Sequence, residues 1–280
     1  MSDDEGQETM MTQTRPKDIV IAVATHKAYR MPTDPVYMPL HVGKALHPEL
    51  NLGFVGDDTG DNISGLNASY SELTGLYWLW KNCDAEYKGL VHYRRHFGMP
   101  DTVKRLATRD RFARIATSDD IDPLVKRAGI IVPRKRHYYI ETIRSHYAHT
   151  FDGYQLDVTR SVLEAMHPEC VPAFDAVMSS RSAHLFNMFI MRADLCNEYC
   201  AWLFPVLERL VKQMPSQQYD AFNARYPGRI SEMLLDVWLL ATGYRYEELP
   251  VVSTEPVNWW KKGTSFLLAK FVGKKYEKSF

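Results

Sequence analysis

The stretch YKGLVHYRRHFG, from Tyr87 to Gly98, decides the fold class. It begins with apolar and small residues, as in a strand that is buried on both faces of a sheet. It then changes to histidine, tyrosine and arginine at positions 92–96. Polar side chains at the carboxyl end of such a strand commonly line a binding site. The stretch therefore predicts a buried strand that carries cations toward a ligand.

The segments around this stretch alternate between strand and helix patterns. Asp18–Lys27 and Leu50–Gly65 begin as apolar strands and end in polar residues. Asn67–Cys83 has apolar residues at the i, i+3, i+4, i+7 spacing of a helix, and Ser69 and Glu72 have the spacing of a capping box. Such alternation predicts an α/β fold, here a single α/β/α sandwich with a mainly parallel central sheet.

The rest of the chain continues this alternation. Further strands are predicted at Ala128–Lys135 and His184–Arg192, and helices at Asp194–Met214 and Arg229–Gly243. No internal repeat and no low-complexity linker separates these segments. We therefore expect one folded domain.

The composition argues against several classes of protein. The chain has 280 residues with 34 basic and 34 acidic side chains, so it lacks the positive charge typical of a nucleic-acid-binding protein. Its four cysteines form no CxxC pair, and we expect reduced thiols in a cytoplasmic protein. The glycine-rich dinucleotide and P-loop fingerprints, the HExxH zinc motif and the nucleophile signatures are absent. No apolar run has the length of a transmembrane helix.

The two ends of the chain differ from the predicted domain at 17–258. Residues 1–16 are polar and acidic and are predicted to be a disordered leader. Residues 259–280 begin with Trp259 and Trp260 and then carry six lysines and one glutamate among aromatic and aliphatic residues. This basic, amphipathic pattern is typical of a segment that lies on an anionic membrane surface. The alternative is a terminal helix packed on the domain with its lysines in water.

Three strand ends carry side chains suited to a ligand, and in a parallel sheet these ends would meet at one edge. The cations among them suit a phosphate group, and the carboxylates suit ribose or sugar hydroxyls. On a regular strand His92 and Arg94 would share one face, and Arg95 would lie on the other. We therefore favour His92 and Arg94 for the phosphates. The residues at these ends are Thr25, His26 and Lys27; Asp57, Asp58 and Asn62; and His92, Tyr93, Arg94 and Arg95.

Two further constellations could have chemical roles. Glu232 and Asp236 lie one turn apart on the predicted helix Arg229–Gly243, with Glu232 in its first turn. A first-turn carboxylate that faces a cleft can act as a general base, and the alternative is compensation of the helix dipole on a solvated face. His146 and His149 have the spacing of two metal ligands on a helix. Since no third ligand is evident, we expect a structural role for them.

Two long motifs resemble a known family. GDNISGLNASYSELTGLYWLWKN, followed by EYKGLVHYRRHF, is similar to the family of domains called DUF4422, and the similarity continues through FNMFIM, YCAWLFPVL and GRISEMLLDVWL. Members occur in capsule, O-antigen and exopolysaccharide gene clusters and are treated as glycosyltransferases. Some resemble β-galactofuranosyltransferases that use UDP-galactofuranose. The resemblance implies that residues 17–258 form a GT-A-like catalytic domain.

The resemblance also implies a donor site. His92, Tyr93 and Arg94 stand where GT-A enzymes usually have an Asp-x-Asp metal motif. An arginine can neutralise the leaving diphosphate directly, so we expect a transfer that does not require a divalent metal. The residues expected near the uracil and ribose are Thr25, His26, Lys27 and Tyr37. Those expected to line the rest of the donor pocket are Asp57, Asp58, Asn62, Tyr93 and Arg95.

The expected reaction is an inverting displacement by an acceptor hydroxyl on the donor sugar. Glu232 is the expected base, with Asp152 and Asp236 as reserves. Arg94 or Arg95, helped by His92, would stabilise the departing UDP. Asn187 would contact the acceptor or the donor sugar.

The expected partners are a nucleotide-sugar donor, a glycan or lipid-linked acceptor, and an anionic membrane surface bound through residues 261–280. These partners would place the protein in the cytoplasm, peripherally on the inner face of the cell membrane. Two other classes remain open. One is a non-catalytic nucleotide-sugar or polysaccharide-binding component of an assembly complex, and the other is a nucleotidyltransferase or phosphatase.

Overall fold

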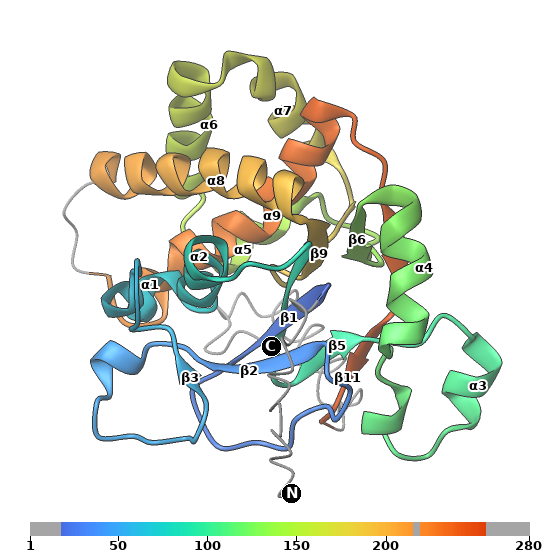
Figure 1. The fold of residues 1–280 in the computed structure, drawn as a ribbon. Coiled ribbons are helices and arrows are strands. Elements are labelled where there is room, and N and C mark those ends of the chain that lie inside the picture. Colours follow the sequence, from blue (N-terminus) through green and yellow to red (C-terminus); the bar gives the residue numbers. More distant parts are fainter. Residues whose placement is uncertain (1–17, 215–218, 256–280) are drawn as a thin grey trace, which may run out of the picture.

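The computed structural model describes residues 18–214 and 219–255, which form helices around one central mixed sheet (Figure 1). The order of the main strands is β10-β6-β9-β4-β1-β2-β3, and β5 pairs with both β4 and β11. The strands are β1 Ile19–Thr25, β2 Tyr37–His41, β3 Val55–Gly56, β4 Tyr87–His92, β5 Arg95–Phe97, β6 Ile130–Pro133, β7 Arg136–His137, β8 Ser182–Ala183, β9 Phe189–Arg192, β10 Glu247–Leu249 and β11 Val251–Ser253. The separate pair β7–β8 lies outside this sheet.

The sheet confirms the predicted α/β class. Strand β1 is parallel to β2 and β4, β2 is parallel to β3, and β10 is parallel to β6. Strand β9 runs antiparallel between β4 and β6. The register pairs Thr25 with His41 and Ala24 with His92. The carboxyl ends of β1, β2 and β4 therefore meet at one edge, as expected for parallel neighbours.

Helices cover both faces of this sheet. Along β1, Val20, Ala22 and Ala24 pack into the larger apolar core, whereas Ile21 and Val23 pack into the smaller one. The larger core contains α2, α6, α7, α8 and α9, and the smaller one contains α4, which stands apart from them (Figure 1). The helices are α1 Asn67–Tyr70, α2 Leu73–Asn82, α3 Thr102–Ala107, α4 Ser118–Ala128, α5 Ile143–Thr150, α6 Tyr154–Met166, α7 Val171–Ser179, α8 Ala193–Gln213 and α9 Tyr226–Thr242.

The opening stretch is a hairpin and not one strand. Strand β4 ends at His92, Tyr93 and Arg94 form a two-residue turn, and β5 returns from Arg95. His92 pairs directly with Arg95 across the hairpin. Directly opposed residues project from the same face, so the predicted grouping of His92 with Arg94 is wrong. The prediction failed because the turn contains neither glycine nor proline to mark it.

Two predicted helix boundaries are also wrong. The helix expected at Asn67–Cys83 is broken at Ser71, whose φ of 52° is in the left-handed region. The expected capping box is not formed, because the Ser69 hydroxyl donates to the Leu66 carbonyl. Helix α9 begins at Tyr226, so Glu232 lies in its second turn and not in its first. Compensation of the helix dipole therefore does not explain Glu232.

The cysteines are free thiols, and three of the four are buried. The described residues form no helix that is long and apolar enough to cross a membrane. The predicted leader 1–16 and tail 259–280 lie outside the described residues.

Candidate active site

A group of cations surrounds the Tyr93 ring at the edge where β1 and β4 end. The Lys27 ammonium lies 5.2 Å from the ring centroid, and the Arg94 guanidinium lies 5.1 Å from it. The His26 ring contacts Tyr93 edge to face at 5.4 Å. Tyr93 itself is buried, whereas Lys27 and His26 are exposed and Arg94 is partly exposed. The aromatic ring therefore supports three basic side chains that remain accessible to an anion.

Arg225 adds a fourth basic group to this cation cluster, which we define as His26, Lys27, Arg94 and Arg225. Partial burial lowers the pKa of His26, and so do the positive charges of Lys27, Arg94 and Arg225. The Arg225 Nε donates to the Ser71 hydroxyl at 3.0 Å, so the left-handed Ser71 helps to place it. The lowered pKa leaves His26 neutral near pH 7, so the positive charges of the cluster are those of Lys27, Arg94 and Arg225, and together they suit an anion with several charges, such as a diphosphate.

A pair of carboxylates, Glu72 and Glu232, lies near Arg95, and the charges of both act on its guanidinium. Oε2 of Glu232 accepts a hydrogen bond from the Phe186 backbone N–H at 3.1 Å. Oε1 of Glu72 accepts from the Asn187 side-chain amide at 2.8 Å. The buried Ser231 hydroxyl donates to the Asn187 carbonyl oxygen at 2.7 Å, which fixes the orientation of that amide. Helix α9, the α1–α2 break and the loop before β9 thus meet at these two carboxylates.

The backbone at this meeting point is strained. Phe186 and Asn187 have φ values of 83° and 51°, and Ser71 has one of 52°. Left-handed backbone is unfavourable for residues with a side chain, and such residues concentrate at functional sites. Here the strain directs the Phe186 N–H toward Glu232 and the Asn187 amide toward Glu72.

The environment of Glu232 makes it a plausible proton acceptor near neutral pH. Burial and the neighbouring charge of Glu72 raise the pKa of Glu232 to about 7. The Phe186 N–H and the charges of Arg95 and Arg136 oppose that rise. A carboxylate with a pKa near the working pH can both take up and release a proton.

Arg95 belongs to this carboxylate region rather than to the cation cluster. Its guanidinium lies 4.7 Å from the centroid of the Phe186 ring. Burial lowers the pKa of Arg95, while the charges of Glu232 and Glu72 raise it. The hairpin therefore divides the two arginines, with Arg94 near Tyr93 and Arg95 near Glu232.

His92 is a neutral group in this site. Burial, together with the charges of Arg95 and Arg94, lowers the pKa of His92 to about 3. Its Nδ1 is buried and has no hydrogen-bond partner within the described part of the chain. His92 therefore offers a neutral imidazole to the site and adds no positive charge against a phosphate.

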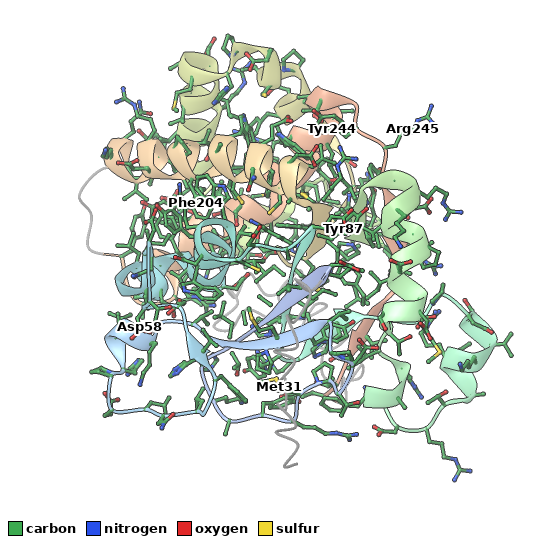
Figure 2. All side chains as sticks on the ribbon, viewed as in Figure 1. Met31, Asp58, Tyr87, Phe204, Tyr244 and Arg245 are labelled. Carbon is green, nitrogen blue, oxygen red and sulfur yellow. The ribbon has the colours of Figure 1, made fainter. Side chains whose placement is uncertain are left out.

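In the acidic loop after β3, two of the predicted donor residues form hydrogen bonds that stabilise the loop itself. The buried Asp57 accepts hydrogen bonds from the Gly43 and Lys44 backbone N–H groups at 2.9 and 3.1 Å. Asn62 bonds within its own loop, to Gly60 and Ser64. Asp57 and Asn62 thus hold the loop, and Asp58 projects from it exposed (Figure 2).

Two other predicted donor residues have structural partners. Tyr37 is buried at the beginning of β2, and its hydroxyl donates to the Ala116 carbonyl at 2.8 Å. Burial raises the pKa of Tyr37. Thr25 is also buried, and its hydroxyl donates to the Lys27 carbonyl at 2.7 Å. Thr25 can shape the loop that carries Lys27, whereas Tyr37 lies in the smaller core, with its ring 5.9 Å from that of His96.

The two reserve carboxylates occupy other environments. Asp152 accepts from the Tyr154 backbone N–H at 3.0 Å and from the Tyr219 hydroxyl at 3.2 Å, at the start of α6. Asp236 is buried and accepts from both the backbone N–H and the ring Nδ1 of His184. The other ring nitrogen of His184 lies 2.7 Å from Glu248. Asp236 therefore joins α9 to β8 and β10.

We predict that Asp236→Asn lowers the free energy of unfolding by about 2 kcal/mol, because the amide cannot accept both hydrogen bonds from His184. Urea unfolding followed by circular dichroism measures this loss. Turnover by the folded variant should stay close to that of the unchanged protein. A variant of normal stability and lost activity would instead make Asp236 a member of the active site.

The histidines at 146 and 149 share one carboxylate. Each bonds through Nδ1 to a different oxygen of Glu141, at 2.8 Å in both cases. Among the residues that the structure describes, no group of three or more His, Cys, Asp or Glu side chains could hold a metal ion.

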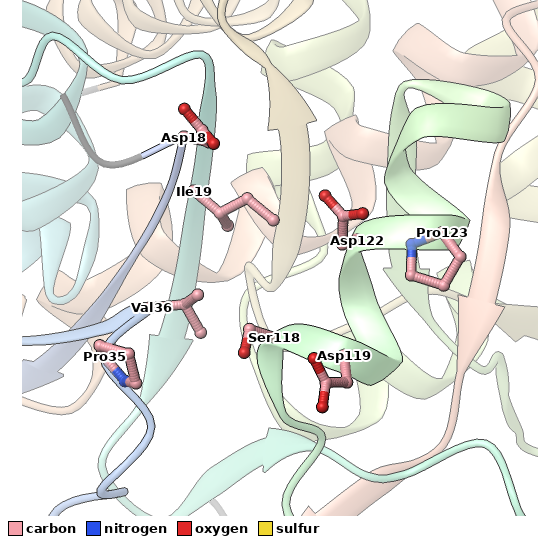
Figure 3. A pocket seen from close by; sticks show the side chains of 8 residues that line it. All are labelled: Asp18, Ile19, Pro35, Val36, Ser118, Asp119, Asp122 and Pro123. Carbon is pink, nitrogen blue, oxygen red and sulfur yellow. The ribbon is translucent and has the colours of Figure 1, made fainter. Parts of the chain in front are cut away.

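A separate hollow of about 440 Å³ lies at the opposite edge of the sheet (Figure 3). It is formed by the starts of β1 and β2 together with the first turns of α4. Its three carboxylates make it unsuited to a diphosphate. Its lining residues are Asp18, Ile19, Pro35, Val36, Ser118, Asp119, Asp122 and Pro123.

The sequence did not single out Glu72, Arg136 or Arg225 for the site. Glu72 was assigned to a helix cap, and Arg136 and Arg225 were not assigned any role. The motif that contains Glu72 also contains the break at Ser71, which places Glu72 directly before α2, with its side chain bonded to Asn187. A local signal for Arg225 is its position one residue before α9.

The comparisons with known proteins point to one family. The model of the family described as "Domain of unknown function (DUF4422)" matches residues 20–243. A solved structure described as the apo form of the bifunctional glycosyltransferase WbbM is 27% identical to the chain, with a TM-score of 0.76. That similarity covers 86% of this chain and 46% of the other, so the chain spans about half of the solved protein. No curated protein matches the chain.

Proposed function

The chain belongs to the DUF4422 family, and on that premise we propose that it is a glycosyltransferase. It transfers galactofuranose from a UDP-sugar to a growing surface polysaccharide or a lipid-linked glycan, with inversion at the anomeric carbon. The observation that carries this proposal is the position of Arg95, which feels both the charge of Glu232, a carboxylate with a pKa of about 7, and that of Arg94 from the cluster of basic side chains at the strand ends. The similarity to a bifunctional glycosyltransferase supports it.

The cation cluster is the proposed site for the donor diphosphate. Lys27, Arg94 and Arg225 carry positive charge, and among the described residues the partly exposed Arg94 has only a 3.4 Å ion pair with Glu255 to compete with a ligand. As the bond to the sugar breaks, negative charge develops on the diphosphate, and fixed cations stabilise that charge. Asp58 and the exposed part of the acidic loop are proposed to contact the donor sugar or ribose.

The carboxylate region is the proposed site of proton transfer. The oxygen of an acceptor hydroxyl forms a bond to the anomeric carbon while the bond from that carbon to the diphosphate breaks. The hydroxyl proton passes to Glu232, and UDP leaves with the bonding electrons. Asn187 and Glu72 are proposed to orient the acceptor sugar by hydrogen bonds, and neutral His92 lies between the two regions.

The pH dependence should report Glu232. Because the base must be ionised and burial raises its pKa to about 7, activity should rise through neutral pH and level off above it. Below the pKa, kcat/KM should fall about tenfold per pH unit. Initial rates between pH 5 and pH 9 measure this profile. A flat profile across neutral pH would remove Glu232 from the proton transfer.

We also propose that the transfer does not require a divalent metal. At the Asp-x-Asp position the chain has His92, Tyr93 and Arg94, which offer no carboxylate for such an ion. Transfer should therefore persist at full rate in excess EDTA. Loss of transfer in EDTA, with recovery on adding manganese, would contradict this proposal.

A ligand-binding experiment tests the choice of nucleotide. A ligand that binds the folded state raises its thermal stability by mass action. Of UDP, GDP and CMP, each at equal concentration, UDP should give the largest rise in the melting temperature. An equal rise with all three would indicate recognition of the phosphates alone, and a larger rise with GDP or CMP would replace the proposed donor.

A further inference from the structure

A second group of cations lies on a loop that extends outward from the active site. Strand β6 ends at Pro133, and the next four residues, Arg134 to His137, are all exposed. Strand β7 pairs with β8, and the Tyr138 N–H donates to the Arg181 carbonyl at 2.8 Å. Arg181 is exposed as well, so two segments distant in the sequence present cations side by side.

These cations are not neutralised by neighbouring acids. Arg134, Lys135, Arg136 and Arg181 take part in no ion pair with any residue that the structure describes. The nearby Glu141 is already bonded to two histidines. The surface therefore has a concentrated positive charge that is available to an outside partner.

Two apolar side chains project from the tip of the same loop. Tyr139 is 79% exposed and Ile140 is 55% exposed. Tyr139 has a φ of 59°, and the Ile140 N–H donates to the Tyr138 carbonyl at 2.6 Å, so a tight turn holds both side chains outward. Left-handed backbone is unfavourable for tyrosine. Exposing the two apolar side chains to water is unfavourable as well, so the folded chain alone gains no stability from this arrangement.

The inner side of the loop contacts the active site. The charge of Arg136 acts on both Glu232 and Arg95. The Tyr138 ring lies 4.1 Å from that of His146, which anchors the loop to α5. A partner bound to the outer side would therefore lie next to the proposed acceptor site.

We propose that Arg134, Lys135, Arg181, Tyr139 and Ile140 form a membrane-docking patch that rests on anionic lipid headgroups. Cations bind the negative surface of such a membrane, and an exposed tyrosine and an aliphatic side chain insert at the interface. A nucleic acid would use the cations but would not account for Ile140. This inference does not rest on glycosyl transfer, because the membrane binds whether or not a donor is present.

The test is co-sedimentation of the full chain with vesicles, without donor. The full chain should bind vesicles that contain phosphatidylglycerol and not those of phosphatidylcholine alone, and 0.5 M salt should release it. The triple variant Arg134→Ser, Lys135→Ser, Arg181→Ser should bind about a hundredfold more weakly. Tyr139→Ser with Ile140→Ser should weaken binding too, because it removes the inserted groups.

Matched controls come from other exposed positions. The triple variant Lys104→Ser, Arg109→Ser, Arg209→Ser removes the same charge, and Val103→Ser with Leu106→Ser removes two exposed apolar side chains from α3. Both should bind the vesicles as the unchanged chain does. The proposal would be overturned if the control variants lost as much vesicle binding as the patch variants. It would also be overturned if the patch variants, at equal melting temperature, bound as the unchanged chain does, or if the full chain did not bind vesicles. Unchanged UDP binding by the patch variants separates this result from a failure of the proposed function.

Discussion

Glu232→Gln is expected to lower turnover by about two to four orders of magnitude, the usual contribution of a general base. The amide nearly preserves the shape of the side chain and can still accept the Phe186 N–H through its carbonyl oxygen. The fold should therefore survive, and the melting temperature should not fall. Initial rates of UDP formation with saturating donor measure the effect. Near-normal turnover in a folded variant would exclude Glu232 as the base.

Two companion variants test whether the loss of turnover is specific to Glu232 or follows from removing any glutamate charge. Glu72→Gln removes a negative charge that helps to raise the pKa of Glu232, so the acid limb of the pH profile should move to lower pH. Glu208→Gln changes an exposed glutamate on α8 whose ion pair in the described part of the chain is with Lys212, and it should leave both rate and profile unchanged. If Glu72→Gln lowers the rate without moving the profile, Glu72 has a role other than tuning Glu232.

Arg94→Met is expected to reduce kcat by about two to three orders of magnitude, the cost typical of losing a fixed donor to developing negative charge. The side chain is partly exposed and its one ion pair, with Glu255, is 3.4 Å long, so stability should change little. Single-turnover rates and UDP affinity together measure the loss. Arg94→Lys should keep part of the rate, because it retains the charge but not the planar group.

Arg109→Met is the matched control for Arg94. Arg109 is exposed and forms no ion pair with a described residue, so its loss should have no effect on transfer. If Arg94→Met binds UDP and turns over normally while Arg95→Met does not, the diphosphate would lie on the other side of the hairpin. In that case Arg95, and not Arg94, would be the arginine that binds the diphosphate.

The fold class could be predicted from the sequence because the apolar periodicity is local. The buried β1 run and the stripe of α9 each specify their element without help from distant residues. The turn at Tyr93 and Arg94 could not be predicted, since neither residue is typical of a tight turn. Because of that one error, the sequence predicts Arg94 beside His92, whereas the structure pairs His92 with Arg95.

The site could be predicted only in part, because its contacts join distant segments. Glu232 and Asn187 could be selected as residue types, but the link from Asn187 to Glu72 spans 115 residues. The left-handed Ser71 that separates α1 from α2 just before Glu72 has no local sequence signal, because serine rarely adopts that backbone. The raised pKa of Glu232 depends on this tertiary arrangement, so it could not be predicted from the spacing of residues in the sequence.

The most direct test of the central claim is the identity of the product released from a panel of nucleotide-sugars. The protein is incubated with UDP-galactofuranose, UDP-galactopyranose, a GDP-sugar and a CMP-sugar, each with a membrane extract that supplies lipid-linked glycans. We predict that UDP is formed from UDP-galactofuranose in step with transfer of the sugar to the extract, and that Glu232→Gln abolishes both. Release of phosphate or pyrophosphate, or binding of UDP without turnover of any donor, would contradict the assignment as a glycosyltransferase.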